Sequence, residues 1–375
     1  MRIGIYTLPL NYNYGGLLQA FALQTVLQQM GHEVVIIDRP LHVKEPFYKR
    51  PREKAKRFVR RYLLFDKSVR VFQENYEAKL YPEISKYTQQ FIDQYLNTIE
   101  VTDTHHLNEY DYDAIIVGSD QIWRCAFHDT KRKLYDAYLE FAESWTHLRR
   151  ISYAASLGTD VWEYSKEKEI RCKSLLAKFD AISVREVSGV QLLKQHFDVE
   201  AIQVLDPTML LDSSDYAKIF ETAHTPVSNG NMMVYVLDDS ARKKELISEY
   251  ESKLQLTAFC VNSQADNINL PVHQRIQPPL DRWLRGFQDA QFVVTDSFHA
   301  CVFSILFGKS FVAIGNKNRG ISRFESLLQM FGLSDRLVSE DGDAYMPKSD
   351  VSLAQTKLKE LRAQSMQYLT SALNK

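Results

Sequence analysis

Residues 1–37 read MRIGIYTLPLNYNYGGLLQAFALQTVLQQMGHEVVII. The β-rich run Arg2–Thr7 predicts a buried strand, and the polar, glycine-bearing segment Leu8–Gly16 predicts a loop. Apolar residues then recur at helical spacing over Leu17–Met30, and the next residue is a glycine, placed where a helix commonly ends. His32–Ile37 returns to a strand-like pattern. This order of strand, loop, helix and strand is a βαβ unit, which predicts parallel strands joined by a right-handed crossover.

The rest of the chain continues this alternation in two series. The first series ends at Asp206-Pro207-Thr208, because proline discourages regular pairing beyond it. We therefore predict two α/β halves, residues 1–209 and residues 210–375. An amphipathic pattern over Leu353–Leu373 predicts one long C-terminal helix. The other predicted strands are Ala114–Val117, Ile151–Ala155, Ala181–Val184 and Ile202–Val204 in the first series, and Met232–Leu237, Leu256–Cys260, Phe292–Thr295 and Phe311–Ile314 in the second.

Length and composition exclude several classes of protein. The 375 residues are 45% hydrophobic and 25% charged, which is typical of a folded globular chain and argues against disorder. The net charge of −1 gives no whole-chain signal for nucleic-acid binding. The four cysteines show no metal-ligand spacing, and no apolar run approaches the roughly 18 residues of a membrane span. We therefore expect a cytoplasmic protein with no spanning helix, no metal and no nucleic-acid partner.

One segment departs from the even charge balance. Between Lys44 and Arg70 the chain holds about eleven Lys and Arg residues against three acids. Phe58, Tyr62 and Leu63 fall within it at near-helical spacing, which predicts a basic amphipathic helix in an insertion at about residues 41–110. Two interpretations stay open: a solvated face of an inserted helical subdomain, or a surface that approaches anionic lipid or a lipid-diphosphate-linked substrate. The second would place the protein at the inner face of the membrane.

Two loops of the first half carry candidate binding residues. Asn13, Gly15 and Gly16 precede the first helix, where glycine permits close approach of the backbone and the helix N-terminus offers unpaired N–H groups. The turn after Ala114–Val117 places Asp120 at the carboxyl end of a strand, which is where ligands bind in parallel sheets. The alternatives are a turn that needs glycine for geometry alone, and an aspartate that only caps a helix.

Charged side chains at three further strand ends extend the candidate site. Arg185 ends one strand, and its guanidinium suits a carboxylate or phosphate, although pairing with neighbouring acids is the ordinary surface outcome. Ser297 and His299 lie in a polar turn between a strand and a helix, a location more typical of catalysis than of packing. Lys317 and Arg319 follow the next strand. A histidine, cations and a helix N-terminus together suit an anionic substrate.

These segments together resemble the polysaccharide pyruvyl transferase family. The resemblance covers roughly residues 1–340, and the motifs occur in the family's order. The matching segments are Tyr12–Gln24 (YNYGGLLQAFALQ), Tyr112–Trp123 (YDAIIVGSDQIW), Ile182–Glu186 (ISVRE), Leu205–Thr208 (LDPT), Thr295–His299 (TDSFH) and Phe303–Lys309 (FSILFGK).

The resemblance implies a GT-B-like fold, with two facing Rossmann-like domains, an active-site cleft between them, and the helix at 353–373 crossing back to the first domain. It implies transfer of pyruvate from phosphoenolpyruvate to two hydroxyls of a sugar in a cell-surface or exopolysaccharide precursor, which forms a ketal and releases phosphate. Phosphoenolpyruvate is then a donor substrate, and no cofactor is expected. The acceptor is expected to be a saccharide, lipid-linked where the basic segment meets a membrane.

By position, the family's histidine falls on His299 and its arginine on Arg185. Many relatives carry an arginine just before that histidine, where this chain has Ser297-Phe298, so we expect Lys317 or Arg319 to hold the donor. His299 suits a general acid and phosphate partner, and Asp120 is a candidate base for a sugar hydroxyl.

Two other functions stay open at this point. A glycosyltransferase on the same scaffold would bind a uridine or guanosine diphosphate and ignore phosphoenolpyruvate. A non-catalytic member of the family would keep the cleft only to bind a saccharide. The sequence makes no prediction of the oligomeric state.

Overall fold

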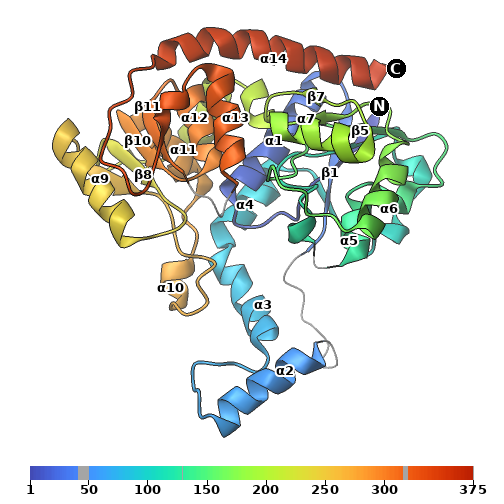
Figure 1. Cartoon of the computed structure of the whole chain (residues 1–375), viewed down its shortest axis with the longest axis horizontal. Coiled ribbons are helices and arrows are strands. Elements are labelled where there is room, and N and C mark those ends of the chain that lie inside the picture. Colours follow the sequence, from blue (N-terminus) through green and yellow to red (C-terminus); the bar gives the residue numbers. More distant parts are fainter. Residues whose placement is uncertain (41–49, 129, 316–319, 375) are drawn as a thin grey trace.

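Two five-stranded parallel sheets form the frame of the molecule (Figure 1). The computed structural model describes residues 1–40, 50–128, 130–315 and 320–374. The first sheet has the order β3-β2-β1-β4-β5 and the second has the order β12-β11-β10-β8-β9. Their bounds are β1 Arg2–Tyr6, β2 Glu33–Asp38, β3 Thr98–Glu100, β4 Ala114–Val117 and β5 Arg149–Ser152, then β8 Met232–Tyr235, β9 Ala258–Cys260, β10 Phe292–Thr295, β11 Ser310–Ile314 and β12 Leu337–Val338.

Each sheet is built around a strand that is buried on both faces. In β1, Ile3 pairs with Val34 on one side and Ala114 on the other, and the strand is buried from its second residue onward. In β10, Val293 pairs with Met233 and Phe311. Short runs of apolar and β-branched residues form such strands because both of their faces are covered by helices. The predicted α/β class with parallel sheets is confirmed.

Helices cover these sheets and connect their strands. Strands β6 (Ser183–Val184) and β7 (Ile202–Gln203) form a small separate sheet, and helix α7 lies between them in the chain. The helices are α1 Tyr14–Gln29, α2 Pro51–Phe58, α3 Gln73–Ile84, α4 Lys86–Tyr95, α5 Lys131–Asp136, α6 Lys166–Leu176, α7 Val187–Leu192, α8 Ser213–Thr222, α9 Ala241–Leu254, α10 Val272–Arg275, α11 Leu280–Asp289, α12 Phe298–Leu306, α13 Ile321–Phe331 and α14 Val351–Asn374.

Helix α1 begins three residues earlier than the apolar pattern predicts. The Asn13 side chain caps it, because Oδ1 accepts hydrogen bonds from the backbone N–H groups of Gly15 (3.1 Å) and Gly16 (3.4 Å). The two glycines, which were expected in the loop, therefore belong to the first helical turn. The helix ends where expected, before Gly31, whose φ of +88° is the left-handed conformation that glycine adopts easily.

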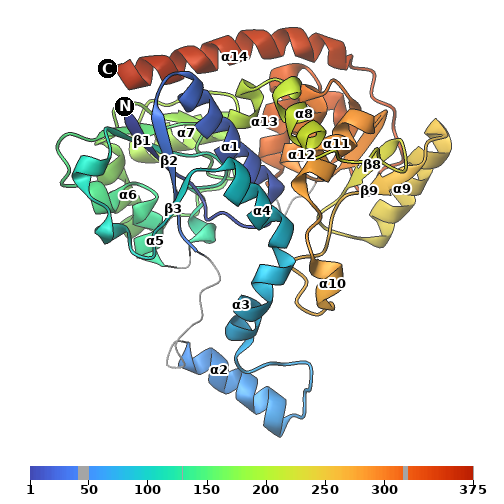
Figure 2. The ribbon, with the colours of Figure 1, turned by 180° about the vertical axis from the view of Figure 1, so that it is seen from behind.

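The C-terminal helix α14 crosses both halves of the molecule, as Figures 1 and 2 show. The Tyr368 hydroxyl donates to the Ser152 carbonyl at 2.9 Å, and the Ser365 hydroxyl accepts from the Leu205 backbone N–H at 3.0 Å. Buried residues of α1, α11, α12 and α14 belong to one continuous hydrophobic core. The two sheets are therefore joined by a shared apolar core as well as by the chain.

A helical projection extends from the body between β2 and β3 (Figures 1 and 2). It consists of α2, a π-helical turn at Val59–Leu63 and α3, and α4 then packs against the body. The insertion predicted at about residues 41–110 includes this projection, and residues 41–49 of that range lie outside the described residues. Thr98–Glu100 joins the first sheet as β3, an edge strand whose three residues give too weak a pattern to be found in the sequence. None of the described helices is long and apolar enough to cross a bilayer.

Candidate active site

Thr295 and Asp296, at the end of β10, hold the turn that positions His299. The Asp296 carboxylate, fully buried after β10, accepts from the backbone N–H groups of Leu237 (2.7 Å) and Asp238 (3.1 Å) and from the Lys243 ammonium (2.8 Å). The Thr295 hydroxyl donates to the Tyr235 carbonyl at 2.6 Å. These bonds lock the ends of β8 and β10 together, so that α12 starts at a defined position with its free N–H groups at the same edge.

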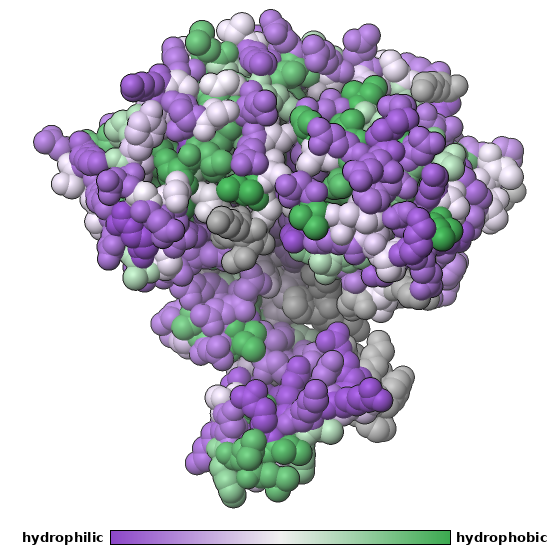
Figure 3. Space-filling view, viewed as in Figure 1, coloured by the Kyte–Doolittle hydropathy of each residue, from purple (hydrophilic) through white to green (hydrophobic). Residues whose placement is uncertain are grey.

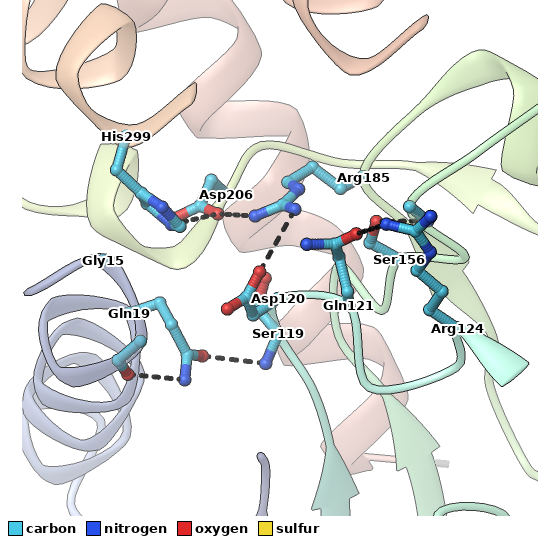
Figure 4. Close-up of polar contacts among 12 residues, drawn as sticks. Gly15, Gln19, Ser119, Asp120, Gln121, Arg124, Ser156, Arg185, Asp206 and His299 are labelled. Atoms are coloured by element: carbon cyan, nitrogen blue, oxygen red, sulfur yellow. Dashed lines mark hydrogen bonds and ion pairs between the residues drawn. The ribbon is translucent and has the colours of Figure 1, made fainter. Parts of the chain in front are cut away.

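His299, from the second half, faces a row of charged side chains from the first half (Figure 4). Its Nε2 lies 3.6 Å from Oδ2 of Asp206, and the same oxygen accepts from Arg185 Nη1 at 2.7 Å. Arg185 Nη2 lies 3.6 Å from Oδ1 of Asp120. The structure thus brings His299, Arg185 and Asp120 together, as predicted, and adds Asp206 as the residue that joins them.

Asp206 is held in its ionised form. Burial opposes its charge, but the neighbouring His299 imidazole, and then the Arg185 guanidinium, outweigh burial, so the pKa of Asp206 falls well below its usual range. The backbone N–H and the hydroxyl of Thr208 also bond to this carboxylate, at 3.0 and 2.7 Å. The sequence motif LDPT contains this residue, but its proline suggested only a domain boundary. The carboxylate itself was missed.

Arg185 is buried among protein groups. Its guanidinium carbon lies 4.2 Å from the centre of the Phe298 ring, and Glu186 adds a third carboxylate at 3.9 Å. Burial opposes its charge, but these three acids raise the pKa of Arg185 above its ordinary value. It does not line either of the two large cavities beside His299. Direct contact of Arg185 with a donor therefore stays a prediction.

Gly15 makes room for the catalytic candidate. A Cβ atom at this position would lie 2.0 Å from Nδ1 of His299, whereas one at Gly16 would meet nothing closer than Asn13 at 3.7 Å. The first turn of α1 therefore packs directly against the imidazole, and Gly15 is required by this contact. Gly16 contributes a backbone N–H to the Asn13 cap and has no such steric role.

Two cavities meet at His299. One has a volume of about 610 Å³ and lies over the ends of β8 and β9, and the other, of about 380 Å³, lies toward Asp120 and α13. Both sit at the carboxyl ends of parallel strands, where this class of fold binds ligands. The residues that border both are Asn11, Asn13, Leu237, Ser297 and His299.

Arg323 is a cation of the smaller cavity that sequence reasoning missed. It lies on α13, and its guanidinium carbon is 5.8 Å from the centre of the Phe298 ring. Burial first, and then the charge of Arg185, lower the pKa of Arg323 to about 10. The residues expected to supply this charge, Lys317 and Arg319, lie outside the described residues. The cluster of cations after β11 was the available signal, but only the fold shows that Arg323 is buried here.

The family model for polysaccharide pyruvyl transferases matches residues 13–318 of the chain. No curated protein is significantly similar to it in sequence. Among solved structures, Arabidopsis thaliana UGT89C1 complexed with UDP-L-rhamnose has a TM-score of 0.49 and 10% identity, with 100% of this chain and 97% of that chain covered.

Two further solved structures are similarly distant. UDP-GlcNAc 2-epimerase from Neisseria meningitidis has a TM-score of 0.47 and 11% identity, with 99% of this chain and 94% of that chain covered. E. coli ADP-heptose lps heptosyltransferase II has a TM-score of 0.38 and 13% identity, with 98% and 100% covered. At these scores the structural likenesses carry no argument about activity.

Proposed function

Because the chain belongs to the polysaccharide pyruvyl transferase family, we propose that it transfers pyruvate from phosphoenolpyruvate to two hydroxyls of a saccharide in a cell-surface or exopolysaccharide precursor. The observation that carries the proposal is the position of His299, which borders both cavities and faces the ionised Asp206. A histidine between two ligand spaces is placed to move a proton between their occupants.

We assign the donor to the smaller cavity. Phosphoenolpyruvate carries a phosphate and a carboxylate, and this cavity offers Arg323, the Ser297 hydroxyl and the N-terminal N–H groups of the nine-residue helix α12. Arg323 takes the part that was expected of Lys317 or Arg319, which remain candidates for further contacts. Arg185 does not contact the donor in this proposal. It positions the Asp206 carboxylate, which in turn positions the imidazole of His299.

We assign the acceptor to the larger cavity. Its lining is rich in amide, hydroxyl and carboxylate side chains, which bond to sugar hydroxyls, and it contains three acids that would repel a nucleotide diphosphate. This composition favours a saccharide over the nucleotide sugar of a glycosyltransferase. The polar residues include Asn11, Asn13, Asn262, Ser263, Gln264, Asn267 and Gln277, and the acids are Asp238, Asp239 and Asp266.

The proposed reaction proceeds as an addition followed by a substitution. One sugar hydroxyl forms a bond to C2 of the enol, and a proton is delivered to the methylene carbon from protonated His299, to which the proton of that hydroxyl returns. The second hydroxyl then forms a bond to C2 as the bond from C2 to the phosphate oxygen breaks, and its proton leaves with phosphate. The Asp206 carboxylate lies 3.6 Å from Nε2 of His299, and Asp120, which borders the smaller cavity, is the candidate base that passes the proton of the second hydroxyl to phosphate.

The test measures phosphate release from phosphoenolpyruvate with a panel of nitrophenyl or lipid-linked glycosides. We expect acceptor-dependent release, and a loss of about 10²–10⁴-fold in His299→Ala. His273→Ala, which changes an exposed histidine on α10, is the matched control and should behave as the wild type. Transfer from a nucleotide sugar without need of phosphoenolpyruvate would contradict the proposal. Saccharide binding without turnover would instead show a non-catalytic member.

A further inference from the structure

The end of the α2 projection exposes a compact group of apolar side chains. We name it the apolar tip: Phe58, Val59, Tyr62, Leu63, Leu64 and Phe65. Each of the six is between 42% and 79% exposed. Figure 3 shows them as a hydrophobic patch at the far end of the projection, beyond a hydrophilic band.

This group is not part of the protein core. None of the six belongs to a hydrophobic core cluster of the described residues, and the Phe58 and Tyr62 rings lie 4.7 Å apart, in contact with each other. Large apolar residues that are exposed elsewhere in the described chain, such as Val161, Ile170 and Val227, stand apart in the sequence. Single exposed apolar residues are normal, but six within eight positions at a protruding end indicate a surface that is covered in use.

The tip is flanked by cations. Residues 50–70 hold nine Lys and Arg side chains against two acids, Glu53 and Asp66. Arg57 pairs with Glu74 and Arg60 with Asp66, at 2.8 and 2.7 Å, whereas Arg52 and Lys56 lie exposed on α2 beside the tip. A positive belt behind an apolar end is the arrangement that fits an anionic lipid surface, where the apolar groups enter the interface and the cations meet the headgroups.

We propose that the apolar tip and its flanking cations dock the protein onto an anionic lipid bilayer without spanning it. The convex tip favours lipid over a second protein, because a stable protein interface needs a partner surface of complementary shape, and the cations behind the tip match anionic headgroups. A bilayer needs no complementary shape. This proposal does not depend on the reaction assigned to the cleft.

The base of the projection is tied to the wall of the larger cavity. Arg275 of α10 pairs with Glu77 of α3 at 2.5 Å, and the ring of Tyr12, which lines that cavity, lies 6.0 Å from the ring of Tyr81 on α3. Docking of the tip therefore holds this cavity at a fixed distance from the lipid surface. A saccharide acceptor carried on a lipid would approach from that side.

The experiment is sedimentation of the full chain with vesicles of phosphatidylcholine alone and of phosphatidylcholine mixed with phosphatidylglycerol, at low and at high salt. We expect binding to the mixed vesicles at low salt, and much weaker binding at high salt or without anionic lipid. Negligible binding in all four conditions would overturn the proposal.

Two variants separate the apolar and the electrostatic contributions. Leu63→Ser/Leu64→Ser/Phe65→Ser should lower binding to the mixed vesicles about tenfold or more. Arg52→Glu/Lys56→Glu should lower it about fivefold or more for each charge, and most of that loss should disappear at high salt. The matched controls are Val227→Ser, an exposed apolar residue far from the tip, and Lys357→Glu/Lys359→Glu on α14, which should bind as the wild type does.

Phosphate release in solution, measured with a water-soluble glycoside, should stay unchanged in the tip variants, which separates failure of this proposal from failure of the proposed reaction. Sedimentation velocity without lipid tests whether a second copy of the chain covers the apolar tip instead. A concentration-dependent dimer that the triple serine variant abolishes would assign the tip to a second copy of the chain and overturn lipid docking.

Discussion

The contact between Gly15 and His299 is the sharpest steric constraint in the site. In Gly15→Ala the new methyl group would lie 2.0 Å from Nδ1, so the imidazole must leave its present position beside Asp206. We expect kcat/KM for phosphate release to fall by about 10² or more, because small displacements of a catalytic group cost this much. Gly16→Ala is the control: its methyl group meets ordinary contacts, and alanine in a first helical turn should stabilise slightly. Equal activity of the two variants would contradict the packing described here.

The charge of Asp206 makes a pH-dependent contribution to stability. Since its pKa in the folded protein lies well below the ordinary value of 3.8, its contribution is complete above about pH 4 and is lost as the pH falls toward the folded pKa. Asp206→Asn leaves Arg185 without its nearest partner, and we expect a loss of about 3 kcal/mol in the free energy of unfolding at neutral pH.

Urea unfolding checks this expectation. The difference between wild type and Asp206→Asn should stay constant above about pH 4 and narrow as the pH falls below it, toward the low pKa of the folded protein. The exposed Asp341 provides the control, because Asp341→Asn should change stability little at any of these pH values. A difference that stays constant with pH would show that the buried carboxylate does not carry its charge.

At the scale of elements, one arginine of α14 bonds to the segment that connects the two halves. Arg362 donates to the carbonyls of Met209 and Leu211 at 2.7 and 2.8 Å and to the Asp212 carboxylate at 2.6 Å. Arg362→Ala removes all three bonds, and we expect a loss of about 1–3 kcal/mol in the free energy of unfolding. Lys359→Ala, an exposed change on the same helix, should cost little. Similar effects of both variants would show that the hydrogen bonds of Arg362 contribute nothing to the free energy of unfolding.

Local pattern was enough to predict the strands that define the fold. Ala114–Val117 and Phe292–Thr295 were predicted to the residue, because a fully buried central strand is a short apolar run between polar turns. The start of α1 was placed late because a capping side chain, rather than an apolar residue, defines it. The edge strand Thr98–Glu100 was missed because its stability comes from its neighbour β2 and not from its own residues.

Sequence reasoning predicted only those site residues that follow the ends of strands. Asp120 follows β4 of the first sheet and His299 follows β10 of the second sheet, so each comes after the carboxyl end of a parallel strand, where ligands bind. Asp206 and Arg323 come from a connection and from a helix, where no periodicity singles out a functional side chain. The partners of Arg185 also depend on tertiary packing, since Asp206 lies 21 residues further along the chain. Sequence reasoning therefore found the site residues that follow strands and missed those that tertiary packing brings to the site.

At the scale of the whole molecule, we expect both halves to unfold together. One apolar core contains residues of α1 from the first half, Trp283 and Phe303 from the second, and Leu369 from α14. The halves also meet backbone to backbone, because a Cβ at Gly320 would lie 2.1 Å from the Gly158 carbonyl oxygen. Calorimetry should therefore show one transition whose calorimetric and van't Hoff enthalpies agree. Two resolved transitions would show that the shared core does not couple the halves.

The meeting of two cavities at His299 bears on the order of events in a turnover. Since each cavity has its own walls and the two share only a short boundary, a ligand in one does not have to leave before the other is filled. For the proposed reaction, both substrates would be present before any bond changes, and the pyruvyl group would pass between them without residing on the protein. Initial-rate lines measured at several acceptor concentrations would then intersect, as in a sequential mechanism, rather than run parallel as they do when a covalent enzyme intermediate separates the two substrates.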